Sequence, residues 1–340
     1  MTADSVRGQV GQVSNGNGVA LSESNLSAVR GGDGCKANGK GVLVAEGGDD
    51  MELAPLGPEF GVEVRGIGLI DVAGSDRAYG SIRAALEEHS VLLFREQQVT
   101  DDVQAAFSRA FGPLERVKIG SVGAGTFYSR LHNMAADGAP VPETHQQALT
   151  ARANQLWHTD SSFKPTPALA SVLSARIVPE HGGETEFTST RQAWSRLTLA
   201  MQSRLRDAVV THSYANSRDQ IDPGLMTQAE RAAVPPVRWR MTWRNPVHGR
   251  IALYIASHAY AIEGMEDDEG RALLAQLIAD ATRPEFTYRH QWRRGDVAMW
   301  DNRATMHRGQ PWPGDQARSM VRTTISAVDA DGLADIRPEK

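Results

Sequence analysis

The tetrapeptide Trp157-His158-Thr159-Asp160 decides how the rest of the chain is interpreted. It lies in an apolar neighbourhood, residues 154–163, whose composition predicts a β-strand. Side chains two residues apart on a strand leave the same face, so the His158 imidazole and the Asp160 carboxylate are expected to converge on one point. Both groups are metal ligands, but two ligands hold an ion poorly, and a third is needed.

The best candidate for the third ligand is His307, in the segment WDNRATMHRG at residues 300–309. Two histidines and one carboxylate on one face of an octahedral ion, with the other face open, are typical of non-haem iron(II) oxygenases. A His-x-Asp pair alone is weak evidence for a metal site, because such pairs also occur as surface salt bridges. The chain also has ten histidines that could supply such a pair. The pattern therefore predicts a metal site only when it is taken with its surroundings.

Arg318 and Arg322 lie four residues apart, shortly after the proposed third ligand. A guanidinium group pairs with a carboxylate through two parallel hydrogen bonds, so two arginines near a metal suit a small dianion. Without the metal ligands, the same two residues are equally typical of a solvated strand face.

Composition excludes several classes of protein. The 340 residues are 41% hydrophobic and 23% charged, with a formal charge of −5, which gives no reason to expect a nucleic acid or an anionic membrane as partner. The longest apolar runs, such as 91–94, are too short to span a bilayer, and the first residues lack a signal-peptide pattern. With one cysteine, Cys35, a reducing cytoplasm is the expected compartment. Symmetric assembly is common, so a homo-oligomer is compatible with this sequence.

The chain divides into a tail and one domain. Residues 1–50 are rich in Gly, Ser, Asn and Ala without apolar periodicity, which predicts a disordered tail. A single domain is predicted over 51–330. Within it, residues 116–153 are rich in Gly, Ala and Pro, and such a long irregular segment is typical of a lid over a functional site.

The domain is predicted to be mainly β with flanking helices. Helices are expected over 76–89, over 101–111 with Thr100 as N-cap, and over 190–209 and 267–282. Many short strands separated by turn residues favour a closed barrel or jelly roll. The expected strands are 62–67, 90–94, 154–163, 169–178, 184–188, 238–245, 251–258, 286–292, 297–300, 304–308 and 321–327.

The segments 154–163, 179–187 and 295–324 closely resemble the taurine dioxygenase and 2,4-dichlorophenoxyacetate dioxygenase family of iron(II)/2-oxoglutarate-dependent oxygenases. The similarity runs from about residue 53 to residue 329 and looks nearer to the phenoxyacetate branch. It implies a double-stranded β-helix, a cupin-like jelly-roll core. It also implies Fe(II) as cofactor, with 2-oxoglutarate and O2 as co-substrates.

The resemblance assigns roles by position. His158, Asp160 and His307 match the family's iron ligands. Thr185 matches a threonine that hydrogen-bonds the distal carboxylate of 2-oxoglutarate, and Arg318 matches the arginine that pairs with the same carboxylate. Judged alone, Thr185 is simply a strand threonine.

The substrate side of the site is assigned in the same way. Arg322 matches an arginine that reaches the substrate's anionic group, and Asn154 matches a position close to the substrate. The phenoxyacetate branch grips its substrate with two lysines, and those positions fall at Gly120 and Ala139 here, with Lys118 near the first but out of register. The resemblance therefore favours a small carboxylate or sulfonate while making phenoxyacetate itself doubtful.

The resemblance implies an enzyme that hydroxylates a small anionic substrate and gives succinate and CO2. When the hydroxylated carbon carries an ether or ester oxygen, the product collapses and the C–O bond is cleaved. Two alternatives remain open at this point: a zinc hydrolase with the same three ligands, and a β-barrel binding protein without catalysis. The remaining histidines are interpreted as core, surface or supporting residues, and His258 lies on a strand that the family places near the pocket.

Overall fold

The computed structural model describes residues 51–117, 124–135, 137–142, 148–149 and 152–339, together with the backbone of two short strands that precede them. These strands, β1 (Cys35–Ala37) and β2 (Leu43–Ala45), lie within the predicted tail, whose other residues are outside the described ranges. All elements named below belong to one compact unit, Cys35–Lys340. No described helix is long and apolar enough to cross a membrane.

The larger sheet has nine strands, and every neighbouring pair is antiparallel except β4 and β5. Its order from edge to edge is β1, β2, β3 (Glu52–Pro55), β4 (Val62–Arg65), β5 (Val91–Phe94), β15 (Val297–Asp301), β7 (Ala168–Ile177), β17 (Ser319–Ser326) and β6 (Ser129–His132).

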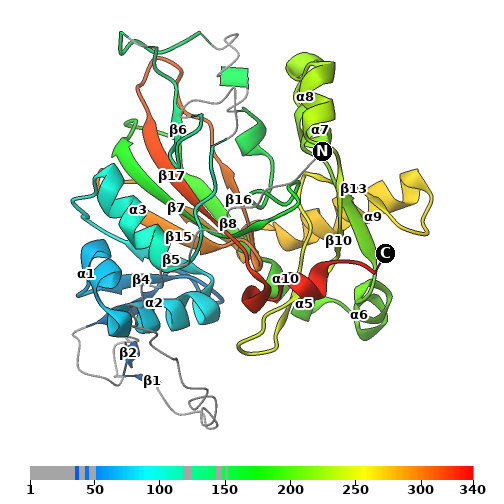
Figure 1. The fold of residues 1–340 in the computed structure, drawn as a ribbon, viewed down its shortest axis with the longest axis horizontal. Helices are drawn as coiled ribbons and strands as arrows, with labels where there is room; N and C mark the ends of the chain where they lie inside the picture. Colours follow the sequence, from blue (N-terminus) through cyan, green and yellow to red (C-terminus); the bar gives the residue numbers. More distant parts are fainter. Residues whose placement is uncertain are drawn as a thin grey trace, which may run out of the picture. The chain divides into compact units, whose positions relative to one another are not determined.

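A smaller antiparallel sheet lies across the core from the larger one (Figure 1). Its order is β14 (Thr287–His290), β8 (Thr185–Ser189) and β16 (Thr305–Gly309). Phe187 of this sheet packs in one apolar cluster with Leu173, Trp300 and Met320 of the larger sheet. The two sheets therefore enclose a shared core, and the predicted double-stranded β-helix is confirmed.

Three helices cover the opposite face of the larger sheet: α1 (Leu69–Gly74), α2 (Asp76–His89) and α3 (Asp101–Ala110). Adjacent residues of β7 demonstrate the two faces, because Val172 packs with the helices whereas Leu173 packs with the smaller sheet. Gln104 of α3 is fully buried and donates to the carbonyl oxygens of Val172 and Val321 at 3.0 and 2.9 Å. This amide ties α3 to the two strands that carry part of the site.

The chain between β8 and β14 supplies most of the remaining elements. Two short sheets are β10 (Val237–Arg240), β9 (Val209–His212) and β13 (Ala259–Ile262), and β11 (Thr242–Arg244) with β12 (Ile251–Leu253). The helices are α5 (Thr190–Arg196), α6 (Leu199–Leu205), α7 (Tyr214–Asp219), α8 (Gln228–Ala233) and α9 (Asp267–Ala281), and α10 (Leu333–Ile336) ends the chain. Single 3₁₀ turns cover Ala153–Gln155, Pro223–Leu225, Pro284–Phe286 and Asp329–Asp331.

Three sequence predictions are wrong in detail. The strand predicted over 251–258 ends at Leu253, and His258 lies in the turn before β13. Residues 154–163 do not form a continuous strand: a 3₁₀ turn precedes the single bridge at His158, and Ser161 has a φ of 57°, which turns the chain away. The predicted helix 190–209 is two helices and a strand. Thr198 starts the second helix, because its side chain accepts a hydrogen bond from the backbone N–H of Met201 at 3.2 Å.

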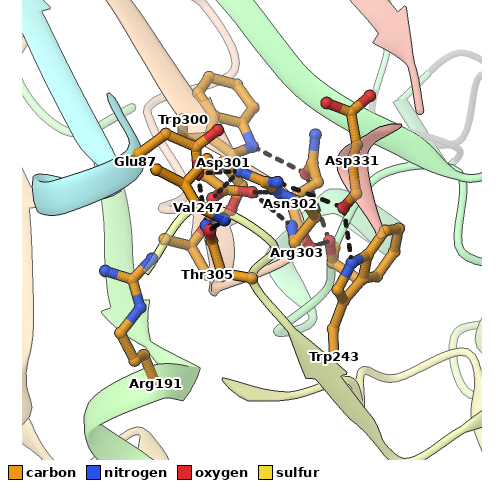
Figure 2. Close-up of polar contacts among 12 residues, drawn as sticks. Glu87, Arg191, Trp243, Val247, Trp300, Asp301, Asn302, Arg303, Thr305 and Asp331 are labelled. Atoms are coloured by element: carbon orange, nitrogen blue, oxygen red, sulfur yellow. Dashed lines mark hydrogen bonds and ion pairs between the residues drawn. The ribbon is translucent and has the colours of Figure 1, made fainter. Parts of the chain in front are cut away.

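A buried ionic cluster joins α2 to the turn between β15 and β16 (Figure 2). Arg303 is 2% exposed, and its Nε and Nη2 donate to the two carboxylate oxygens of Asp301, both at 2.9 Å. Nη2 also contacts Glu87 Oε2 at 2.6 Å, and Nη1 donates to the Asp331 carbonyl oxygen at 3.3 Å. The cluster holds the turn from which β16 begins, four residues before His307.

Replacing Arg303 with Ala is expected to lower the free energy of unfolding by about 3–5 kcal/mol, because two buried carboxylates lose their counter-ion. Urea denaturation followed by circular dichroism measures this. Arg271→Ala is the control, since that arginine pairs with Asp267 on the surface of α9 at 3.4 Å and its loss should leave unfolding nearly unchanged. Equal effects of the two substitutions would contradict a stabilising role for the cluster.

Candidate functional site

Three side chains from distant parts of the sequence meet at one point of the core. His158, Asp160 and His307 are all buried, and one candidate ligand atom from each lies within 4.8 Å of the others. The Nε2 atoms of His158 and His307 lie 4.0 and 3.7 Å from the Asp160 carboxylate oxygens. The structure thus brings together the three residues that the sequence analysis singled out as metal ligands.

A backbone bridge sets this spacing. The N–H of each histidine donates to the carbonyl oxygen of the other, at 3.0 Å from His158 and 2.8 Å from His307. His158 Nδ1 lies 2.7 Å from the Leu156 carbonyl oxygen, a contact that places the ring proton on Nδ1 and leaves the Nε2 lone pair for a ligand. The ring centres of His158 and His307 lie 4.1 Å apart, and the Trp300 ring centre lies 4.5 Å from that of His307.

Asp160 is held by a relay of polar side chains. Its backbone N–H donates to Asn302 Oδ1 at 3.1 Å, and its Oδ2 accepts from Ser171 at 2.7 Å. Asn302 Nδ2 donates in turn to Ser171 Oγ at 3.0 Å, which closes the relay. Neither Asn302 nor Ser171 was singled out as a site residue from the sequence, because only folding brings both of them to Asp160.

The electrostatics of the three residues suit a divalent cation. Burial on its own would raise the pKa of the Asp160 carboxyl, but Arg322, whose Nη1 lies 2.5 Å from Oδ1, holds that pKa well below its usual range. Burial lowers the pKa of both His158 and His307, which keeps the imidazoles neutral. Two neutral imidazoles and one carboxylate are a donor set that fits Fe(II). The Nδ1 atom of His307 is buried and has no hydrogen-bond partner among the described residues.

Arg318 is a buried cation beside the triad. It is 7% exposed, its Nη2 donates to the Gly183 carbonyl oxygen at 3.1 Å, and its guanidinium carbon lies 4.9 Å from the Trp312 ring centre. Burial lowers its pKa to about 10, so it stays protonated at neutral pH. It has no carboxylate partner in the part of the chain that the structure describes, which makes it a candidate receptor for an anion.

Two neighbours shape the space around Arg318. Gly183 has a φ of +71°, and a Cβ there would lie 3.0 Å from Arg318 Nε, so the glycine leaves room for the guanidinium. Thr185 is 3% exposed, and its hydroxyl oxygen accepts from the Trp292 ring N–H at 2.9 Å. The Thr185 hydroxyl can therefore donate its own proton to a ligand.

These groups open onto one cavity of about 470 Å³. Its lining includes the triad, Thr185, Arg318, Arg322 and Asn154, so every site residue predicted from the sequence faces the same space. His258, which lies in a turn rather than on the predicted strand, also lines it, as do Phe163, Tyr214 and Arg218. The last two come from α7 and carry no sequence signal of a site. Of the positions compared above with the two substrate-binding lysines of the phenoxyacetate branch, Ala139 is exposed. Gly120 and the nearby Lys118 are outside the described residues.

Comparisons with known proteins give a consistent answer. The profile of the family described as taurine catabolism dioxygenase TauD, TfdA family matches residues 52–324. The chain is 39% identical over 275 residues to the alpha-ketoglutarate-dependent 2,4-dichlorophenoxyacetate dioxygenase of Cupriavidus pinatubonensis, covering 79% of this chain and 96% of that protein. It is 33% identical over 293 residues to the (S)-phenoxypropionate/alpha-ketoglutarate-dioxygenase of Sphingobium herbicidovorans, covering 83% and 97%.

A solved structure agrees with these relatives. The crystal structure of AAD-2 in complex with Mn(II) and N-oxalylglycine superposes with a TM-score of 0.76 at 36% identity, covering 82% of this chain and 97% of that chain.

Replacing Asn302 with Ala is expected to weaken Mn(II) binding about 10- to 100-fold, because Asp160 loses the amide that orients it. Equilibrium dialysis of the purified protein measures this. Asn216→Ala is the control, since that amide holds the Ser257 carbonyl oxygen at 3.1 Å and contacts no ligand of the triad. Wild-type affinity in the Asn302 variant would show that Ser171 alone suffices to orient Asp160.

Proposed function

The chain belongs to the taurine catabolism dioxygenase (TauD, TfdA) family, and on that premise we propose how its own residues bind the metal, the co-substrate and the substrate. The protein is an Fe(II)- and 2-oxoglutarate-dependent dioxygenase, which hydroxylates a small organic substrate and forms succinate and CO2. The observation that carries the assignment is the meeting of His158, Asp160 and His307 in the same cavity as a buried, uncompensated Arg318.

We assign the metal to His158, Asp160 and His307. Bound there, Fe(II) supplies the redox chemistry that activates O2. The protein supplies neutral imidazoles, an ionised carboxylate and a buried surrounding, and the Asn302–Ser171 relay keeps Asp160 in place. A carboxylate at position 160 favours oxygenation over halogenation, since relatives that halogenate lack this ligand.

We assign the distal carboxylate of 2-oxoglutarate to Arg318 and Thr185. Arg318 offers a guanidinium fork that meets a carboxylate through two hydrogen bonds, and Thr185 adds a hydroxyl. An anion there would compensate a cation that is otherwise buried without a counter-charge. The zinc hydrolase alternative gives these two residues no role.

We assign the substrate to the part of the cavity that Arg322 and Asn154 border. The relatives named above act on phenoxy acids, and a small carboxylate or sulfonate is the proposed substrate class here. If the hydroxylated carbon carries an ether or ester oxygen, loss of that oxygen cleaves the C–O bond. The segment 116–153 is proposed to cover this cavity, because Val117, Phe127 and β6 line it.

We further propose one catalytic domain over residues 51–330, preceded by the tail. A reducing cytoplasm is the proposed compartment, because the chain has a single cysteine and forms no internal disulfide.

The function is tested by mixing the purified protein with Fe(II), 2-oxoglutarate, O2 and a panel of small carboxylates and sulfonates. Substrate-dependent release of succinate is expected, measured by mass spectrometry. The double variant His158→Ala, Asp160→Ala should lose this turnover completely, because one histidine cannot hold the metal. Turnover retained in the double variant would refute the ligand assignment.

Replacing Arg318 with Gln is expected to raise the KM for 2-oxoglutarate about 100-fold, because the distal carboxylate loses its charged partner. Initial rates over a range of 2-oxoglutarate concentrations measure this. Arg308→Gln is the control, since that arginine follows His307 in the chain but is not among the residues that line the cavity and pairs with Glu186 at 2.7 Å. A larger change in the KM for the substrate than for 2-oxoglutarate would reassign Arg318.

A further inference from the structure

The cavity holds more positive charge than its own acidic groups compensate. Arg322 pairs with Asp160 at 2.5 Å, and Arg130 pairs with Asp101 at 2.6 Å. Lys164 pairs with Glu115. Among the described residues that line the cavity, three arginines are left without a carboxylate partner: Arg116, Arg218 and Arg318.

These three cations differ in their surroundings. Arg318 is the one assigned above to 2-oxoglutarate. Arg116 is exposed, and its side chain lies over the Phe127 ring at 4.9 Å. Arg218 is half-buried, and its Nε is fully shielded from solvent without a hydrogen-bond partner. Because Arg218 is half-buried and has no carboxylate partner among the described residues, a bound anion would stabilise it more than the exposed Arg116, whose charge water already screens.

Aromatic rings hold Arg218 in place. Its Nη2 donates to the Tyr214 hydroxyl oxygen at 3.0 Å, and its guanidinium carbon lies 4.1 Å from the Tyr214 ring centre. The ring centres of Tyr214 and Phe163 lie 4.6 Å apart, and those of Phe163 and His258 lie 4.8 Å apart. His258 in turn lies 6.3 Å from the metal-binding His158. A continuous aromatic wall therefore runs from the triad to the Arg218 guanidinium.

The backbone fixes the distance between Arg218 and the triad. The Ser257 N–H donates to the Trp157 carbonyl oxygen at 2.9 Å, which ties the turn before β13 to the residue preceding His158. The Ser213 N–H donates to the His258 carbonyl oxygen at 2.8 Å, which ties the start of α7 to the same turn. Arg218 is thus positioned by the same scaffold that positions the first metal ligand.

We propose that Arg218 binds the anionic group of the primary substrate, while the apolar part of the substrate lies against Phe163, Tyr214 and His258. This inference rests on the proposed function and names the residue that selects its substrate. Arg322 is then the neighbour that neutralises Asp160, and its charge is already committed. The ligand chemistry is a carboxylate or sulfonate, because both present oxygens to a guanidinium fork.

The test measures binding rather than turnover. Protein loaded with Mn(II) and N-oxalylglycine is titrated in a calorimeter with phenoxyacetate, with benzylsulfonate and with the neutral phenoxyacetamide. Wild-type protein is expected to bind at least one of the two anions more tightly than the amide. Arg218→Gln is expected to weaken that anion about 10- to 100-fold and to change amide binding less than about twofold.

Two further variants separate charge from structure. Arg218→Lys keeps the charge and loses the fork, so it should recover part of the anion affinity. Arg116→Gln removes an exposed cation of the same cavity and should leave anion binding unchanged. If Arg218→Gln also loses binding of N-oxalylglycine, the Arg218→Lys variant decides between the two explanations. Partial recovery of anion affinity in Arg218→Lys supports the proposal. Wild-type anion affinity in Arg218→Lys would show that the guanidinium fork contributes nothing.

The proposal is overturned if Arg218→Gln binds both anions within twofold of wild type, or if wild-type protein binds neither anion better than the amide. It is also overturned if Arg116→Gln weakens the anions as much as Arg218→Gln does. These outcomes leave the proposed function intact, since binding of Mn(II) and N-oxalylglycine and formation of succinate from 2-oxoglutarate report on it separately.

Discussion

Two backbone hydrogen bonds between His158 and His307 are the constraint on which the site depends. They join the turn-rich segment before β7 to β16 of the smaller sheet, so the two histidine backbones have one fixed spacing, from which both imidazoles reach the same cavity. Asp160 is anchored by Ser171 of β7 in the larger sheet and by Asn302, which lies in the turn between β15 and β16. Both sheets of the jelly roll therefore contribute to a single metal centre, and the centre requires their correct packing.

Four arginines of this molecule differ in their partners, and the partners indicate three different roles. Arg303 is surrounded by Asp301 and Glu87, so its charge is compensated within the fold and it stabilises the turn before β16 (Figure 2). Arg322 compensates a metal ligand, Asp160. Arg318 and Arg218 have no carboxylate partner among the described residues, which is the state expected of groups that wait for an external anion.

This distribution of charge links the fold to the reaction. In the proposed function, a dianionic co-substrate and an anionic substrate lie in one cavity without repelling each other, which requires separate cationic groups at separate walls. Arg318 directly precedes β17 and lies beside Gly183, in the turn between β7 and β8, whereas Arg218 lies on α7 at the end of the aromatic wall. In this proposal, the insertion between β8 and β14 supplies substrate contacts, while the two sheets and the turns beside them supply the residues for the metal and the co-substrate.

The sequence by itself determined the features that depend on neighbouring residues. The bounds of α2, the Thr100 cap of α3, the buried strand β7 and the His158–Asp160 pair follow from periodicity, capping and spacing, which act over a few residues. With the resemblance added, roles for His307, Thr185 and Arg318 are also predicted, and the structure places all three residues on the same cavity. Only the tertiary structure decided that residues 154–163 form a turn with a single bridge, because the partner of that bridge is His307. It alone brought Asn302 and Ser171 to Asp160 and Arg218 to the cavity, since each of these contacts joins segments far apart in the chain and leaves no trace in local composition.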